Sequence, residues 1–162
     1  MEHGFIPDNE VEAMALHEEA IAHLYESFAE AFPEHGEFWL KLASEEHSHA
    51  DWVRRFKVNI EEGKVSLNES RFNIPAIETS VAYINGYAVQ ARNRQLNIRH
   101  AASIALDIEN ALLDRKFLEI YETDDEELVK VLNGLSEATK AHQGRVREFL
   151  DNLDDSVEDA IG

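Results

Sequence analysis

Apolar residues recur at intervals of three or four along most of this chain, which is the spacing of one face of an α-helix. The 162 residues include only 7 Gly and 3 Pro, so few positions would break a long helix. A chain of this length suits one hydrophobic core. We therefore expect a single all-α domain over 1–162. The core helices should cover about 8–33, 36–62, 97–122 and 125–153, and a further helix should cover about 75–94.

Residues that stop or cap helices divide the core helices into two pairs. Pro33 interrupts the first apolar pattern, and a glycine follows the end of the second. Asn97 is suited to cap the third helix, and Asp124 lies in the acidic turn before the fourth. The segments 8–62 and 97–153 should therefore each form an antiparallel helical hairpin. The acidic end from Asp154 onward is expected to fray.

Ionisable residues occupy several inward positions of these apolar faces. Burying an unpaired charge costs several kcal/mol, which is comparable with the net stability of a whole domain. Such interruptions need a common explanation, and binding of a cation by the buried carboxylates would supply one. The residues concerned are Glu18, Glu46, His49, Glu109 and His142.

The positions of these residues relative to the turns predict that they meet. In an antiparallel hairpin, residues equally distant from the turn lie at the same height. Glu18 and Glu46 are equally distant from Phe32, beside the expected turn, and Glu109 and His142 are centred on the second acidic turn. Each hairpin should therefore bring its own polar residues face to face near its middle.

The residue types indicate which cation would bind. Glu46 and His49 are three residues apart, so both should project from one helix face towards one point. The chain has no cysteine, which excludes thiolate ligands, disulfides and a rubredoxin-type centre. Carboxylates with a few imidazoles favour iron or manganese, and zinc is a further candidate.

This pattern resembles the ferritin-like superfamily, in particular the rubrerythrin-type di-iron carboxylate proteins. In these proteins a Glu from each of two helices joins a Glu-x-x-His from each of the other two. The matching segments are EEAIAHLY at 18–25, SEEHSHA at 44–50 and ALDIE at 105–109. The resemblance spans residues 8 to about 153. It implies a ferritin-like antiparallel four-helix bundle with a long helical crossover between helices 2 and 3.

The resemblance also implies a function. The expected ligands Glu18, Glu46, His49, Glu109 and His142 would hold one or two iron ions, and the protein would oxidise Fe(II) with O2 or peroxide or handle iron. An electron-donor protein and a homodimer are expected with it. The alternative is a degenerate bundle with a mononuclear metal or none, acting as an interaction or structural subunit. An unrelated helical adaptor is a third hypothesis.

One position departs from the family pattern. The fourth helix reads Thr139-Lys140-Ala141-His142, which keeps the histidine and lacks the Glu that bridges the two metals in the resembled proteins. Glu137 cannot replace it, since its spacing from His142 directs it to another face. The additional helix-three Glu of rubrerythrins is absent too, because that position is Leu112. We therefore expect a metal stoichiometry nearer one than two.

Simpler interpretations of the same residues remain open. Glu18 could be one of two exposed neighbouring acids, and Glu109 could pair with Lys116. His142 could be a core histidine bonded to Thr139 or to a backbone carbonyl. Tyr25 is expected in the core with its hydroxyl satisfied. The remaining singled-out histidines are expected on the solvated surface: His17, His23, His35, His47 and His100.

The net charge excludes one class of partner. Asp and Glu total 33 against 15 for Lys and Arg, a formal charge of −18, which is the wrong sign for binding nucleic acid. The N-terminus has no basic region followed by an apolar run, and no apolar stretch approaches the length of a membrane span. We expect a cytoplasmic protein with no membrane partner.

Overall fold

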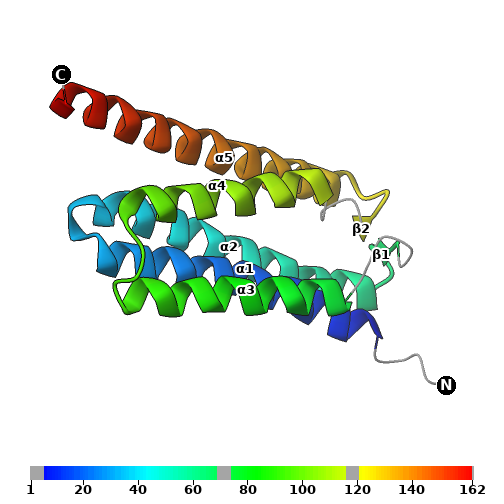
Figure 1. The fold of residues 1–162 in the computed structure, drawn as a ribbon. Coiled ribbons are helices and arrows are strands. Elements are labelled where there is room, and N and C mark those ends of the chain that lie inside the picture. Colours follow the sequence, from blue (N-terminus) through cyan, green and yellow to red (C-terminus); the bar gives the residue numbers. More distant parts are fainter. Residues whose placement is uncertain (1–5, 69–73, 116–120, 162) are drawn as a thin grey trace.

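The computed structural model describes residues 6–68, 74–115 and 121–161, with side chains described for 10–68, 74–113 and 121–153. Within these ranges the fold is all-α, with five α-helices and two strands of two residues each (Figure 1). In the same ranges, no helix has both the length and the apolar composition that a membrane crossing requires.

The first two helices form a hairpin. Helix α1 covers Ile6–Ala31 and α2 covers Gly36–Glu61, and the short 3-10 helix η2 (Pro33–His35) turns the chain between them. Aromatic side chains close the turn end of this hairpin, where the rings of Phe28 and Trp39 pack edge to face with centroids 4.9 Å apart. Both side chains are fully buried, so the turn is fixed by hydrophobic packing.

Helix α3 (Ile74–Arg92) connects the two hairpins and runs along α1 (Figure 1). Helix α4 (Ile98–Arg115) begins where Asn97 Oδ1 accepts the backbone N–H of His100 at 2.8 Å, which confirms the predicted cap. Helix α5 (Glu126–Ile161) begins in the same way, because Asp125 Oδ1 accepts the backbone N–H of Glu127 at 3.0 Å.

Two expected helix boundaries are wrong. The helix expected over 97–122 cannot reach its last two residues, because β2 (Tyr121–Glu122) pairs antiparallel with β1 (Ser66–Leu67). The expected end of the fourth helix near 153 is also too early, since α5 continues to Ile161. Pairing with a distant segment explains the first difference. For the second, residues 154–161 contain neither Gly nor Pro, so no helix-breaking residue ends α5 near 153.

The buried core consists of two apolar clusters. One lies towards the turn of the first hairpin and contains Tyr25, Phe28 and Trp39. The other contains Val11 and Phe56 and lies towards the opposite end of that hairpin. The α4–α5 hairpin joins the first cluster through Phe149, whose ring stacks on Phe38 with centroids 4.2 Å apart. Buried ionisable residues stand between the clusters along α1 and α2.

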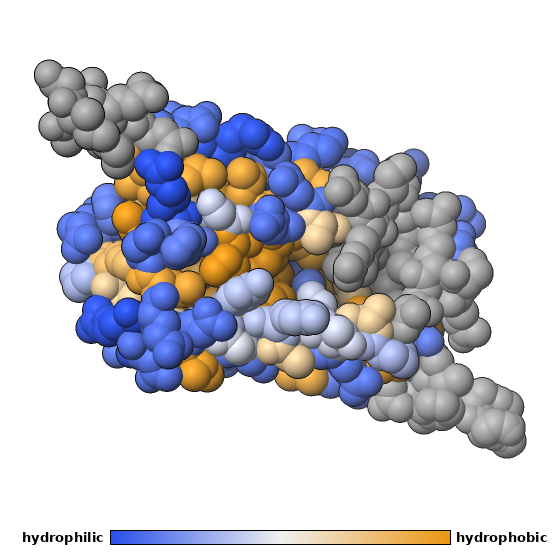
Figure 2. Space-filling view, viewed as in Figure 1, coloured by the Kyte–Doolittle hydropathy of each residue, from blue (hydrophilic) through white to orange (hydrophobic). Residues whose placement is uncertain are grey.

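The face of the molecule drawn in Figure 2 has a hydrophobic region between hydrophilic margins. Figure 2 shows hydrophobic residues gathered around the space between α3 and α4, with hydrophilic residues on the outer sides of the helices. A cavity of about 140 Å³ opens there. None of the residues expected to bind metal lines it; its walls are formed by His17, Ser80, Tyr87, Ile104, Asp107, Ile108, Ala111 and Leu112.

Candidate metal centre

Glu46 is the central residue of the buried polar group. It lies in the middle of α2 and is 1% exposed. Its Oε1 is 2.8 Å from Nδ1 of His142 on α5, and its Oε2 is 3.5 Å from Nδ1 of His49, one turn further along α2. One carboxylate therefore contacts the imidazoles of both hairpins, and the two rings stack with centroids 5.3 Å apart.

Two sets of three possible ligands share Glu46. In the first set, one ligand atom each from Glu18, Glu46 and His49 lies within 4.8 Å of the others. In the second set the same holds for Glu46, Glu109 and His142. The structure thus brings together all five side chains that the sequence singles out, with Glu46 common to both sets.

Residues around the ligand sets orient their members. The hydroxyl of Tyr25, in the core as expected, donates to Glu109 Oε1 at 2.8 Å. His142 directs Nδ1 towards Glu46 and donates from Nε2 to Glu45 Oε1 at 2.8 Å. Arg145 Nη1 donates to the same oxygen at 2.9 Å. An imidazole held in this way by a second carboxylate is typical of metal-ligating histidines.

Glu45 and Arg145 are functional candidates that the sequence interpretation missed. Helical periodicity assigns Glu46 to the inward face and leaves its neighbour Glu45 outside. The contact between Glu45 and His142 depends on how α5 packs against α2, which the sequence of α2 alone does not encode. The one available signal is the spacing of Arg145, one turn after His142 on α5.

Burial and mutual repulsion divide the protons among the acids. Burial, and next the charge of Glu46, raise the pKa of Glu18 well above its ordinary value. Burial alone would raise the pKa of Glu46 too, but close contacts with Glu18, His142 and His49 outweigh it and hold that pKa well below the ordinary value. Burial also raises the pKa of Glu109. These opposite shifts favour the charged form of Glu46 and the protonated form of Glu18.

The same contacts charge His142. Burial would lower its pKa, but the hydrogen bonds and charges of Glu109 and Glu46 prevail and raise the pKa of His142 to about 10. The buried group therefore carries its positive charge as a proton on His142, whereas a metal-loaded group would carry it as a metal ion. Metal binding at these residues must release protons.

Three buried carboxylate oxygens test whether a cation fits. Glu18, Glu46 and Glu109 each have an Oε2 atom that is shielded from solvent and makes no hydrogen bond within the described residues. A buried polar atom without a partner costs about 1–3 kcal/mol. All three belong to the two ligand sets, so a dication bound there would contact oxygens that otherwise make no hydrogen bond. The donor set fits a metal that prefers oxygen ligands.

Thr139, at the fourth-helix position where the resembled proteins have a Glu, hydrogen-bonds within its own helix. Thr139 is half-buried, and its hydroxyl donates to the Leu135 carbonyl of its own helix at 3.0 Å. Lys140 points outward and pairs with Glu137, and both side chains are exposed. Leu112 is buried in the apolar core.

The simpler interpretations can now be compared with the observed contacts. His142 bonds to glutamates and not to Thr139. Of the adjacent acids Glu18 and Glu19, the outer one is Glu19, which accepts from Arg54 at 2.7 Å. The suggested partner of Glu109, the side chain of Lys116, lies outside the described residues.

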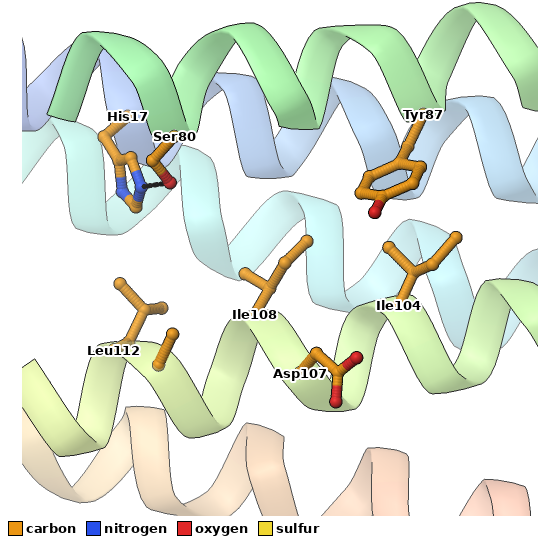
Figure 3. A pocket seen from close by; sticks show the side chains of 8 residues that line it. His17, Ser80, Tyr87, Ile104, Asp107, Ile108 and Leu112 are labelled. Carbon is orange, nitrogen blue, oxygen red and sulfur yellow. Dashed lines mark hydrogen bonds between the residues drawn. The ribbon is translucent and has the colours of Figure 1, made fainter. Parts of the chain in front are cut away.

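His17 is not a solvated surface residue, contrary to expectation. It is 2% exposed, and its Nε2 lies 2.9 Å from Ser80 Oγ on α3, opposite Ile108 and Leu112 (Figure 3). Packing of α3 against α1 buries this side of α1. The apolar pattern of the α1–α2 hairpin alone cannot predict this burial. His23 and His100 are exposed, and His35 and His47 are half-buried.

Comparison of this chain with known protein families, with curated proteins and with solved structures finds no match.

Proposed function

We propose that the chain is a ferritin-like bundle that binds iron, or a similar dication, in its interior. Helices α1, α2, α4 and α5 would form the four-helix bundle, and α3 would be the crossover. The observation that carries the proposal is the position of Glu46, whose two oxygens face one imidazole from each hairpin. Glu18 adds a carboxylate to the set that contains His49, and Glu109 adds one to the set that contains His142.

The residues divide the work of holding the ions. Glu18, Glu46 and His49 would bind one ion, and Glu109, His142 and the shared Glu46 would bind a second one. Iron bound there would supply electrons to dioxygen or peroxide, and Fe(II) itself would be the substrate. Tyr25 fixes the orientation of Glu109, and Glu45 fixes that of His142, so that the ligand atoms stay directed inward.

The experiment that tests this proposal is anaerobic Fe(II) titration followed by exposure to oxygen. Wild-type protein should bind at least one Fe(II) per chain and consume oxygen on reoxidation. Glu46→Gln should abolish both, whereas the outward Glu137→Gln should change neither, because Glu137 is exposed and pairs with exposed Lys140. Equal Fe(II) binding by wild type and Glu46→Gln would refute the proposed site.

A second candidate function is favoured by Thr139. Since its hydroxyl bonds to its own helix, the α4–α5 hairpin supplies only two members of the second ligand set, and the third, Glu46, comes from the other hairpin. A degenerate bundle that binds a single structural ion in the first set and acts as an interaction subunit would account for the missing carboxylate. Tight binding of one ion with no oxygen consumption would support this alternative over the oxidase.

A further inference from the structure

A second group of ligand-type side chains lies on the outer face of the α1–α2 hairpin. His23 and Glu26 stand one turn apart on α1, and His47 reaches them from α2. His47 Nε2 is 3.2 Å from Glu26 Oε2, and the rings of His23 and His47 meet edge to face with centroids 5.7 Å apart. One ligand atom from each residue lies within 4.8 Å of the others.

These distances are close to those around a small cation. Zinc–nitrogen and zinc–oxygen bonds of about 2.0–2.2 Å at tetrahedral angles place neighbouring ligand atoms about 3.4 Å apart. The separation of 3.2 Å between His47 and Glu26 already meets this requirement. The side chains of His47 and Glu26 are 40% and 44% exposed, so small rotations can bring the third ligand atom closer without disturbing the core.

This surface group is separate from the buried one. Glu46 and His47 are adjacent in sequence, but successive residues of a helix point about 100° apart. Glu46 is accordingly 1% exposed and faces α5, whereas His47 faces Glu26 and solvent. None of the three surface residues belongs to either buried ligand set.

The surroundings are favourable to a cation. Glu19, four residues before His23 on α1, is paired with Arg54. Arg54 already occupies that carboxylate at 2.7 Å, which leaves Glu26 as the carboxylate directed at the imidazoles. The net charge of −18 adds a general attraction for cations.

We propose that His23, Glu26 and His47 form a surface binding site for a transition-metal dication that prefers imidazole ligands, such as Zn²⁺. Two imidazoles and one carboxylate are a ligand set that holds zinc and leaves a fourth position for water. The buried sets are richer in carboxylates and favour harder ions. The two groups should therefore differ in metal preference.

The test is calorimetric titration with Zn²⁺ alone, on the full chain and on variants. His23→Gln, Glu26→Gln and His47→Gln should each weaken one binding event roughly tenfold or more, since even residues that only support a ligand change affinity by that much. His100→Gln removes an exposed histidine on α4 and should change nothing. Glu46→Gln should keep the surface event, and circular dichroism should show all variants folded.

The outcomes separate this site from the buried one. If His47→Gln binds Zn²⁺ as wild type does, the surface site is refuted, while the proposed interior site is unaffected. If His100→Gln weakens binding as much as His47→Gln, the binding is non-specific and the proposal also fails. Substitution of Zn²⁺ by Co²⁺ gives a second measurement, because loss of tetrahedral d–d bands in His47→Gln but not in Glu46→Gln would locate the ion on the surface.

Discussion

The two helical hairpins contribute unequally to the buried polar group. The α1–α2 hairpin supplies Glu18, Glu46 and His49, which form a ligand set without help from elsewhere. The α4–α5 hairpin supplies Glu109 and His142, and at the equivalent of Glu46 it has Thr139. Its ligand set is completed only by Glu46 from the first hairpin. In the proposed function the first hairpin would hold an ion with its own residues, whereas the second would need Glu46 from the first.

The asymmetry also appears in the protonation of the two halves without metal. His142 is held as an imidazolium by the acids around it, including Glu46 and Glu109. The positive charge of His142 thus joins the hairpins in the metal-free state, and a bound ion would take over that role. We infer that metal loading strengthens the contact between hairpins more than the packing within either one.

The largest effect is expected at the shared residue. Glu46→Ala should abolish metal binding in both halves and leave the helical content unchanged. An ion at a hundred times its dissociation constant stabilises wild type by about 2.7 kcal/mol, or roughly 5–10 °C in Tm for a chain of this size. Thermal melts with and without Mn²⁺ measure this difference. Glu137→Ala is the control, and a metal-dependent rise in Tm that survives in Glu46→Ala would contradict the account.

The next effect separates the hairpins. His49→Gln removes a ligand from the self-sufficient set, and His142→Gln removes one from the set that borrows Glu46. We expect His49→Gln to weaken the tighter binding event by a hundredfold or more, on the order of 3 kcal/mol. His142→Gln should affect only the weaker event. Fe(II) titrations measure both, and identical titration curves for the two variants would remove the proposed difference between the halves.

A gain of function would sharpen the same comparison. Thr139→Glu should supply the carboxylate that the second hairpin lacks, raise Fe(II) stoichiometry towards two and speed oxidation by dioxygen. It should also destabilise the metal-free protein, because like charges would crowd beside Glu46 and Glu109. Lys140→Glu, on the exposed face, should do neither. If both variants behave alike, the inward position assigned to residue 139 is wrong.

The smallest effect concerns pH in the absence of metal. The pKa of His142 is raised in the fold to about 10, from its ordinary value of 6.5. Its contribution to stability is complete below pH 6.5 and is lost as pH rises through about 10. Metal-free Tm should therefore fall between about pH 7 and about pH 10.

A variant identifies the group responsible for this fall. His142→Gln cannot lose a proton in that window, so its metal-free Tm should depend less on pH than that of wild type. His100→Gln, exposed on α4, should follow wild type. An alkaline fall of equal size in His142→Gln and wild type would show that His142 is not the titrating cation.

Periodicity predicts the local features of this molecule well. The expected helix ranges fall on α1 to α5, Asn97 caps α4 as predicted, and the five inward ionisable residues meet at mid-hairpin. These features follow from spacing within one helix or one hairpin. Their role as metal ligands stays a prediction.

Features that depend on packing between distant segments were not predictable in this way. His17 is buried because α3 lies against α1, and Glu45 becomes a partner of His142 because α5 lies against α2. The strands β1 and β2 have two residues each, which is too few to show the alternation of apolar and polar residues that identifies a strand. The surface pair of His47 and Glu26 likewise depends on the rotation of α2 relative to α1.

The most direct test of the central claim is the anomalous scattering of crystals loaded with Fe(II) or Mn²⁺ under anaerobic conditions. The account predicts a strong peak between Glu18, Glu46 and His49 and a weaker or absent one between Glu109, His142 and Glu46. Two peaks of equal full occupancy would contradict the inequality of the hairpins. A map with no interior peak would contradict the metal centre itself.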